Sequence, residues 1–99
     1  MARVKFSRKA IDDLSAIWEY TYETWSEKQA DKYYRLLISA CEELAADPKL
    51  GREYFEVYPD LLGMLTSKHI IFYRVTGKAS IEVIRILHAE MDLKNKIEE

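Results

Sequence analysis

Two arginines lie inside the two most hydrophobic segments of the chain, where a buried strand favours apolar side chains. Arg74 falls in SKHIIFYRV (67–75) and Arg85 falls in IEVIRILHAEMD (81–92). Each arginine is therefore either one half of a cross-strand pair or part of a working surface that the sheet presents.

The alternation of side chains along a strand separates these two interpretations for Arg74. With a three-residue loop at 77–79, Phe72 lies opposite Ile84 and Arg74 lies opposite Glu82. Such an exposed cross-strand ion pair contributes roughly 0.2–1 kcal/mol. The sequence thus predicts that Arg74 and Glu82 form a structural pair.

The same alternation leaves Arg85 without a charged partner. It places Arg85 beside Ile71 and near Tyr73, on the face opposite Arg74. That face is otherwise apolar, so we expect Arg85 to be the better candidate for a functional contact.

Three other side chains could do chemistry. His69 and His88 could form a metal site or an acid–base pair, but no further His or Cys stands at ligand spacing, which favours strand-end histidines with local hydrogen bonds. Cys41 could be a nucleophile, yet it lies in a helical apolar stripe and is predicted to be a small core residue. With only three glycines there is no phosphate-binding loop either. We therefore predict no catalytic residue, no metal site and no cofactor.

These residues need an α+β scaffold to position them. Periodicity and capping signals predict a first strand, two antiparallel helices, three antiparallel strands and a short helical tail, within a single domain spanning residues 1–99. The helices are expected to pack on one face of the sheet. The expected ranges are 2–6 for the first strand, 7–24 and 26–46 for the helices, 62–68, 69–75 and 80–88 for the other strands, and 89–99 for the tail. Ser7 and Ser26 are the expected N-caps, Pro48 stops the second helix, and residues 48–61 are expected to form a loop.

Apolar stripes at helical spacing predict the core. The first helix carries Ile11, Leu14, Trp18, Tyr22 and Trp25 at this spacing, and the second carries Ala30, Tyr34, Leu37, Cys41 and Leu44. An alternative is that the aromatic side chains form a stacking platform for nucleic-acid bases, but their helical period favours a core. We expect Trp18, Tyr22, Leu37 and Leu44 to be mostly buried.

Composition limits the classes of partner. The 48% hydrophobic content allows a core, and the formal net charge of −2 argues against a protein that binds nucleic acid through its phosphates. The chain shows neither a signal peptide nor a membrane-spanning run, and its single cysteine fits a reducing cytoplasm. Both sheet faces are predicted to be apolar while one helix hairpin covers only one, so we expect the other face to bind a partner.

Five segments of the sequence resemble the RelE/ParE superfamily of bacterial toxins, and its ParE branch most closely. They are Ala10-x-x-Asp13-Leu14-x-x-Ile17-Trp18-x-Tyr20, the run 69–75 (HIIFYRV), Ile84-Arg85-Ile86-Leu87-His88-x-x-Met91-Asp92, Ala30-x-x-Tyr33 and Leu44-Ala45-x-x-Pro48-x-x-Gly51. The second and third are the most specific, and the resemblance covers nearly the whole chain.

The resemblance implies a non-enzymatic toxin of a type II toxin–antitoxin system. Such a protein inhibits DNA gyrase by binding and is neutralised by a ParD-like antitoxin, as a homodimer or as a heterotetramer with that antitoxin. On this basis we predict that target or antitoxin binding involves Tyr73, Arg85, His88, Met91 and Asp92.

The RelE branch offers an alternative activity, which is ribosome-dependent cleavage of messenger RNA. Those relatives use basic residues on the strands and a tyrosine near the carboxyl terminus. Here the corresponding positions hold Ile70, Ala89 and Glu90, and no tyrosine follows Tyr73. A third interpretation is a decayed toxin that retains only antitoxin binding.

Overall fold

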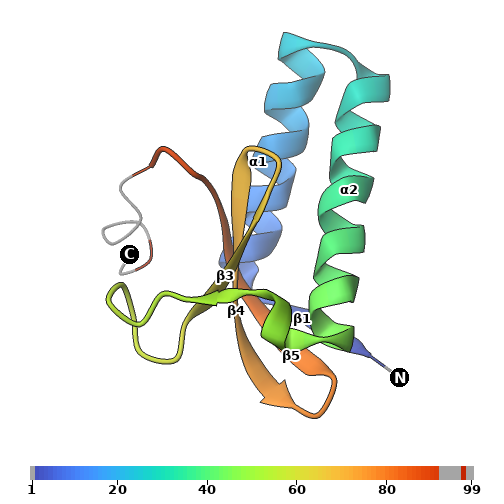
Figure 1. Cartoon of the computed structure of the whole chain (residues 1–99). Coiled ribbons are helices and arrows are strands. Elements are labelled where there is room, and N and C mark those ends of the chain that lie inside the picture. Colours follow the sequence, from blue (N-terminus) through green and yellow to red (C-terminus); the bar gives the residue numbers. More distant parts are fainter. Residues whose placement is uncertain (1, 92–96, 98–99) are drawn as a thin grey trace.

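The computed structural model describes residues 2–91 and residue 97, and these form a helix hairpin and a five-stranded sheet (Figure 1). The strands lie in the order β1-β5-β4-β3-β2, with β1 parallel to β5 and all other neighbours antiparallel. The predicted α+β class is thus confirmed, in a mixed sheet. The elements are β1 (Arg3–Phe6), α1 (Arg8–Thr24), α2 (Glu27–Ala46), the 3-10 helix η1 (Pro48–Leu50), β2 (Arg52–Glu53), β3 (Leu62–Thr66), β4 (His69–Gly77) and β5 (Ser80–His88).

Two serines begin the two helices, as predicted. The Ser7 hydroxyl accepts a hydrogen bond from the Ala10 amide (3.0 Å), and the Ser26 hydroxyl accepts one from the Gln29 amide (3.1 Å). Each cap satisfies one of the amides that a helix start leaves without a partner. At the other end, Pro48 stops α2 and begins η1.

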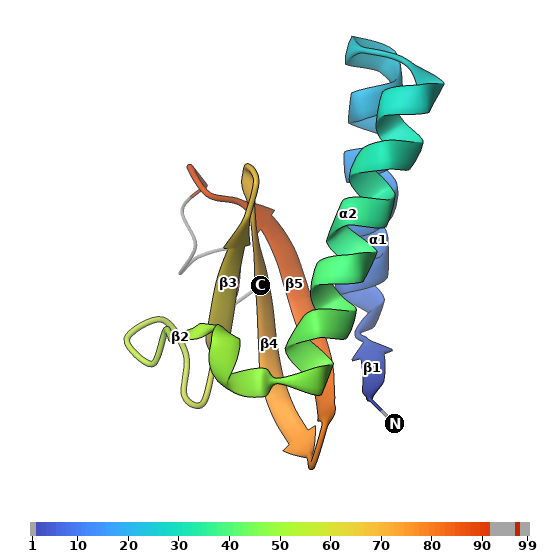
Figure 2. The same cartoon turned by 45° about the vertical axis from the view of Figure 1, so that its right-hand side comes forward.

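The helix hairpin covers one face of the sheet and extends beyond it (Figure 2). Its sheet-facing side chains are buried against those of β4 and β5 and form the main core. Leu37 and Leu44 are fully buried, as expected. This core also contains Ala10, Leu14, Ala40, Cys41, Ala45, Ile71, Tyr73, Ile81, Val83 and Ile86.

The predicted core stripes are wrong at Ile11 and Tyr34, which are 49% and 42% exposed along one side of the hairpin, and the stripe of α1 is wrong again in its outer half. Leu14 is buried, but Trp18 is only partly buried, Tyr22 is 50% exposed and Trp25 is 70% exposed. The reason is that the far part of the hairpin rises past the end of the sheet, where no strand lies beneath it (Figure 2). Helical periodicity gives the faces of a helix but not the length over which a sheet supports it.

The register of the β4–β5 hairpin is confirmed around Arg74 but shifts on both sides of it, and the predicted loop at 77–79 is wrong because Gly77 belongs to β4 and pairs with Ser80. Arg74 pairs with Glu82 and Tyr73 lies opposite Val83, as the predicted register requires, but Phe72 lies opposite Arg85 instead of Ile84. Ile84 is therefore an extra residue in β5, a bulge that moves every later side chain by one position. Arg85 consequently lies opposite Phe72 and does not share a face with Tyr73, contrary to the prediction.

The second face of the sheet is not left bare, which corrects another expectation. A smaller core of Tyr54, Leu61, Ile70, Phe72 and Leu87 lies there. The segment between β2 and β3, predicted to be a loop, folds back over this face, and Ile97 packs against the same cluster.

The predicted tail helix at 89–99 falls largely outside the described residues. Residues 89–91 follow β5 as a turn, with the Ala89 amide bonded to the Lys68 carbonyl (3.0 Å). Across residues 2–91 and 97, the helices are too short or too polar to cross a membrane.

Candidate partner-binding surface

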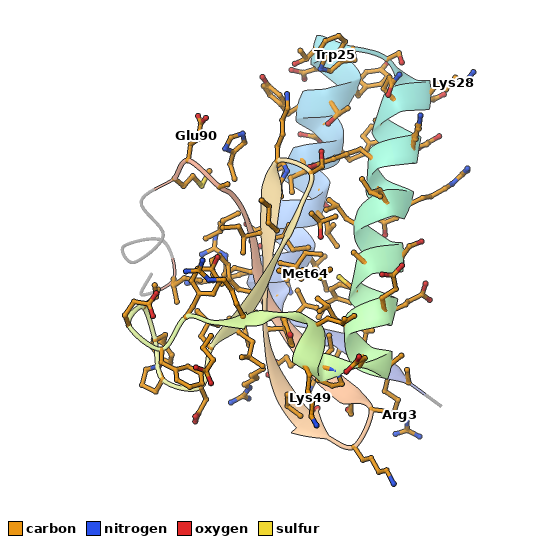
Figure 3. All side chains as sticks on the ribbon, in the orientation of Figure 1. Arg3, Trp25, Lys28, Lys49, Met64 and Glu90 are labelled. Atoms are coloured by element: carbon orange, nitrogen blue, oxygen red, sulfur yellow. The ribbon has the colours of Figure 1, made fainter. Side chains whose placement is uncertain are left out.

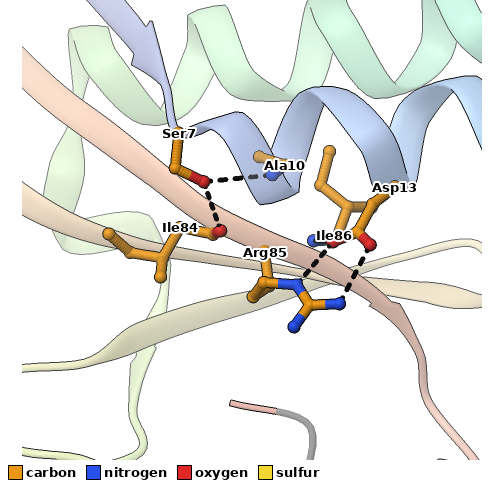
Figure 4. Close-up of polar contacts among 6 residues, drawn as sticks. All are labelled: Ser7, Ala10, Asp13, Ile84, Arg85 and Ile86. Carbon is orange, nitrogen blue, oxygen red and sulfur yellow. Dashed lines mark hydrogen bonds and ion pairs between the residues drawn. The ribbon is translucent and has the colours of Figure 1, made fainter. Parts of the chain in front are cut away.

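Arg85 is held by a carboxylate that the sequence interpretation did not assign to it (Figure 4). Its Nε donates to Asp13 Oδ2 (2.8 Å) and a terminal nitrogen donates to Asp13 Oδ1 (3.0 Å), which makes a two-pronged ion pair. The Arg85 and Asp13 side chains are only 12% and 15% exposed. Paired and mostly buried, Arg85 ties α1 to β5, and the prediction that it has no partner is wrong.

Local geometry explains why Asp13 stands there. β1 pairs with β5 only as far as Val83, and Ser7 then turns the chain into α1, donating its hydroxyl to the Ile84 carbonyl (2.6 Å). Helix α1 thus continues along the edge of β5 that β1 has left. There Asp13 accepts a hydrogen bond from the Ile86 amide (3.0 Å), in the place that the carbonyl of a neighbouring strand would take (Figure 4).

Tyr73 is fully buried, so its side chain is not available to a partner in this conformation. Its hydroxyl donates to the Pro48 carbonyl (2.7 Å) and accepts from the Gly51 amide (3.0 Å). Burial raises the pKa of Tyr73, with Asp47 adding to the rise and the Gly51 amide opposing it. A Cβ at Gly51 would collide with the tyrosine ring, so the glycine permits this close contact. Tyr73 fastens η1 to the sheet.

His69 and His88 lie opposite each other on β4 and β5, with ring centroids 5.3 Å apart. The Tyr33 hydroxyl lies 2.7 Å from His69 Nδ1 and accepts the Lys68 amide (3.3 Å), while His88 Nδ1 accepts the Glu90 amide (3.2 Å). The predicted local hydrogen bond is confirmed for His88, whereas the partner of His69 comes from α2, 36 positions away in the chain. Among residues 2–91 and 97, no group of three or more His, Cys, Asp or Glu side chains could hold a metal ion.

The surroundings of His69 favour its neutral form. Burial, chiefly, lowers the pKa of His69 from 6.5 to about 4; the nearby His88 and Lys68 act in the same direction and Asp13 opposes them. At neutral pH the Tyr33 hydroxyl can therefore donate to His69 Nδ1 while Nε2 carries the ring hydrogen.

The remaining candidates divide between core and surface. Cys41 is fully buried, and burial, helped by Glu42, raises the pKa of its thiol to about 12. It is a core residue, as predicted. Met91 is 45% exposed and stays a candidate for binding, whereas Asp92 lies outside the described residues.

A groove runs between the two helices on the side that carries Ile11 and Tyr34. It encloses about 500 Å³ and has mainly apolar walls, including Leu14 and Ile38. The Trp18 ring lines it and is fixed by a hydrogen bond from its Nε1 to Asp31 Oδ1 (3.0 Å). The groove can accept an apolar segment of a partner, such as one face of an amphipathic helix.

Two aspects of this surface could not be obtained from apolar periodicity alone. The groove lies between the two helices, and helical periodicity had assigned the large apolar side chains at its rim to the core. Asp13 did carry a signal, because it lies three residues after Ala10 and one before Leu14, on the sheet-facing side of α1. An acidic residue among buried positions requires a cation or amides nearby.

Comparison with known proteins agrees with this fold. Residues 4–93 match the family model described as the ParE toxin of the type II toxin–antitoxin system parDE. The chain is 38% identical over 96 residues to Toxin ParE1 of Mycobacterium tuberculosis, covering 97% of this chain and 98% of that protein. It is 32% identical over 94 residues to Toxin ParE1 of Caulobacter vibrioides, covering 95% and 96% of the two chains.

A solved structure shares the architecture. A chain of a chromosomal ParDE toxin–antitoxin system from P. aeruginosa matches with a TM-score of 0.77 at 24% identity, covering 91% of this chain and 98% of that one. With the family model and the two relatives, the fold confirms the resemblance seen in the sequence: this chain belongs to the ParE toxins of type II toxin–antitoxin systems.

Proposed function

We propose that this toxin inhibits DNA gyrase by binding one of its states and trapping it, with no bond chemistry of its own. The support is the family membership together with the roles of the polar side chains. Tyr73 and Arg85, two of the predicted binding residues, both have side chains engaged in contacts within the fold. The described residues therefore present a contact surface to solvent and no set of free catalytic side chains, which suits inhibition by binding.

We also propose that a ParD-like antitoxin holds the toxin inactive by filling the groove between α1 and α2. The observation that carries this proposal is the groove itself, with about 500 Å³ between apolar walls and Ile11 49% exposed at its rim. An apolar helix face or strand from the antitoxin would bury this surface, and stable binding needs a total of about 1,000 Å² or more. A heterotetramer of two toxins and two antitoxins is the assembly we expect.

Cleavage of messenger RNA is the competing activity, and specific residues disfavour it. The position that would carry a strand arginine is Ile70, which is 6% exposed and belongs to the smaller core. Ala89 and Glu90 stand where the basic pair would be. The Tyr73 hydroxyl bonds two backbone groups and is not free to act as a base.

The test is a pair of assays on the purified toxin. We expect inhibition of gyrase supercoiling with accumulation of cleaved DNA, and recovery when the antitoxin is added in equimolar amount. In parallel, the toxin is incubated with ribosomes and messenger RNA. Cleavage of the RNA without any effect on gyrase would overturn the proposal, and loss of both activities with intact antitoxin binding would indicate the decayed toxin.

A further inference from the structure

The far end of the helix hairpin displays aromatic side chains that the fold does not use. This hairpin tip, residues 18–31, joins α1 to α2 beyond the sheet, and Figure 3 shows Trp25 at its end. Tyr20 is 68% exposed, Tyr22 50% and Trp25 70%. Large aromatic side chains exposed on a projecting element are typical of a protein-binding site.

One of these exposed aromatic side chains, Tyr22, is held in place before any partner arrives. The Tyr22 ring stacks on Trp18 at 5.3 Å and 8°, and Trp18 is bonded to Asp31 of α2 (3.0 Å). A pre-ordered aromatic side chain loses little conformational entropy on binding, which is why such residues often dominate the binding energy.

The hairpin tip is also acidic. Residues 18–31 contain Glu19, Glu23, Glu27 and Asp31 against the single base Lys28. The last turn of α1 has no basic residue, although the carbonyl end of a helix favours one, so Glu23 adds to the negative potential there. This arrangement opposes helix stability and therefore calls for another explanation.

We infer that the hairpin tip is the surface that contacts gyrase, and that it docks on a lysine- and arginine-rich surface of that enzyme. The inference rests on the proposed function. An enzyme that holds DNA must expose cationic side chains to the phosphates. Arginine also stacks on Trp and Tyr rings while it pairs with nearby carboxylates. The tip meets the groove at Trp18, Glu19 and Asp31. Tyr20 and Trp25 do not line the groove, so gyrase and antitoxin contact different side chains of the hairpin.

Binding of the full-length toxin to purified gyrase holoenzyme tests this inference, with supercoiling inhibition as a second readout. The double variant Tyr20→Ala/Trp25→Ala should bind gyrase at least tenfold more weakly. Its affinity for the antitoxin should stay within about twofold of the wild type. Phe55→Ala, which removes a similarly exposed ring (49%) between β2 and β3, is the matched control and should bind gyrase normally.

A charge-reversal variant tests the chemistry of the partner. Glu23→Lys/Glu27→Lys should weaken binding to gyrase, and the salt dependence of its affinity should be smaller than that of the wild type. Circular dichroism confirms that each variant folds. If the wild type inhibits gyrase and both double variants bind gyrase as tightly as the wild type, this inference alone is overturned. If the wild type does not bind gyrase, the proposed function and this inference are overturned together.

Discussion

At the scale of single residues, Arg74 and Arg85 have opposite surroundings. Arg74 pairs with Glu82 at 2.9 Å while its own side chain is 60% exposed, so solvent screens the pair. Arg85 pairs with Asp13 through two hydrogen bonds in a mostly buried position. Removing one member of such a pair leaves the other charge without compensation.

This contrast predicts different costs for the same substitution. Arg85→Met should lower the free energy of unfolding by about 3 kcal/mol, because Asp13 loses its cation. Arg74→Met is the control and should lower it by less than about 1 kcal/mol. Urea denaturation measures both, and equal effects of the two substitutions would contradict the structural role of Arg85.

His69 makes stability depend on pH. Its pKa is about 4 in the folded chain and 6.5 in the unfolded chain, so between these values only the unfolded state binds the extra proton. The contribution of neutral His69 to the free energy of unfolding is therefore complete above pH 6.5 and is lost as the pH falls towards 4. Partial exposure of the ring limits the loss to on the order of 2 kcal/mol.

The corresponding measurement compares thermal unfolding of the wild type and His69→Phe between pH 7.5 and about 4. The wild type should lose more stability across this range than the variant, in which no imidazole titrates at that position. Parallel curves for the two proteins would show that His69 does not contribute.

At the scale of elements, the hairpin has a supported half and a free half. Where α2 lies over the sheet, Leu37 is fully buried, whereas Tyr22 near the end of α1 is half exposed. Leu37→Ala should thus cost about 2–5 kcal/mol of stability, and Tyr22→Ala less than about 1 kcal/mol. Trp18→Ala should fall between them. Chemical denaturation checks this order, and a large loss for Tyr22→Ala would mean that the hairpin end packs more closely than the structure shows.

At the scale of the whole molecule, there are two proposed binding surfaces, the groove for the antitoxin and the hairpin tip for gyrase. Ile11→Asp places a charge at the apolar groove and should weaken antitoxin binding at least tenfold. Because Ile11 is half exposed, the free energy of unfolding should change by no more than about 0.5 kcal/mol. Isothermal titration calorimetry measures the affinity, with Phe55→Asp on the opposite side of the sheet as control. Normal antitoxin affinity of Ile11→Asp would place the antitoxin elsewhere.

The sequence by itself determined the features that depend on neighbouring residues. Ser7 and Ser26 begin the helices and Pro48 ends the second, because caps and proline act within one turn. Strand alternation gave the Arg74–Glu82 pair, which lies close to the turn that sets the register. The motif segments identified the family.

Only the tertiary structure decided how distant segments meet. The Ile84 bulge shifts Arg85 to face Phe72, and the start of α1 beside β5 brings Asp13 to Arg85, 72 positions away in the chain. Likewise, which part of α1 is buried depends on where the sheet ends. These outcomes follow from packing between elements, and local periodicity carries no information about such contacts.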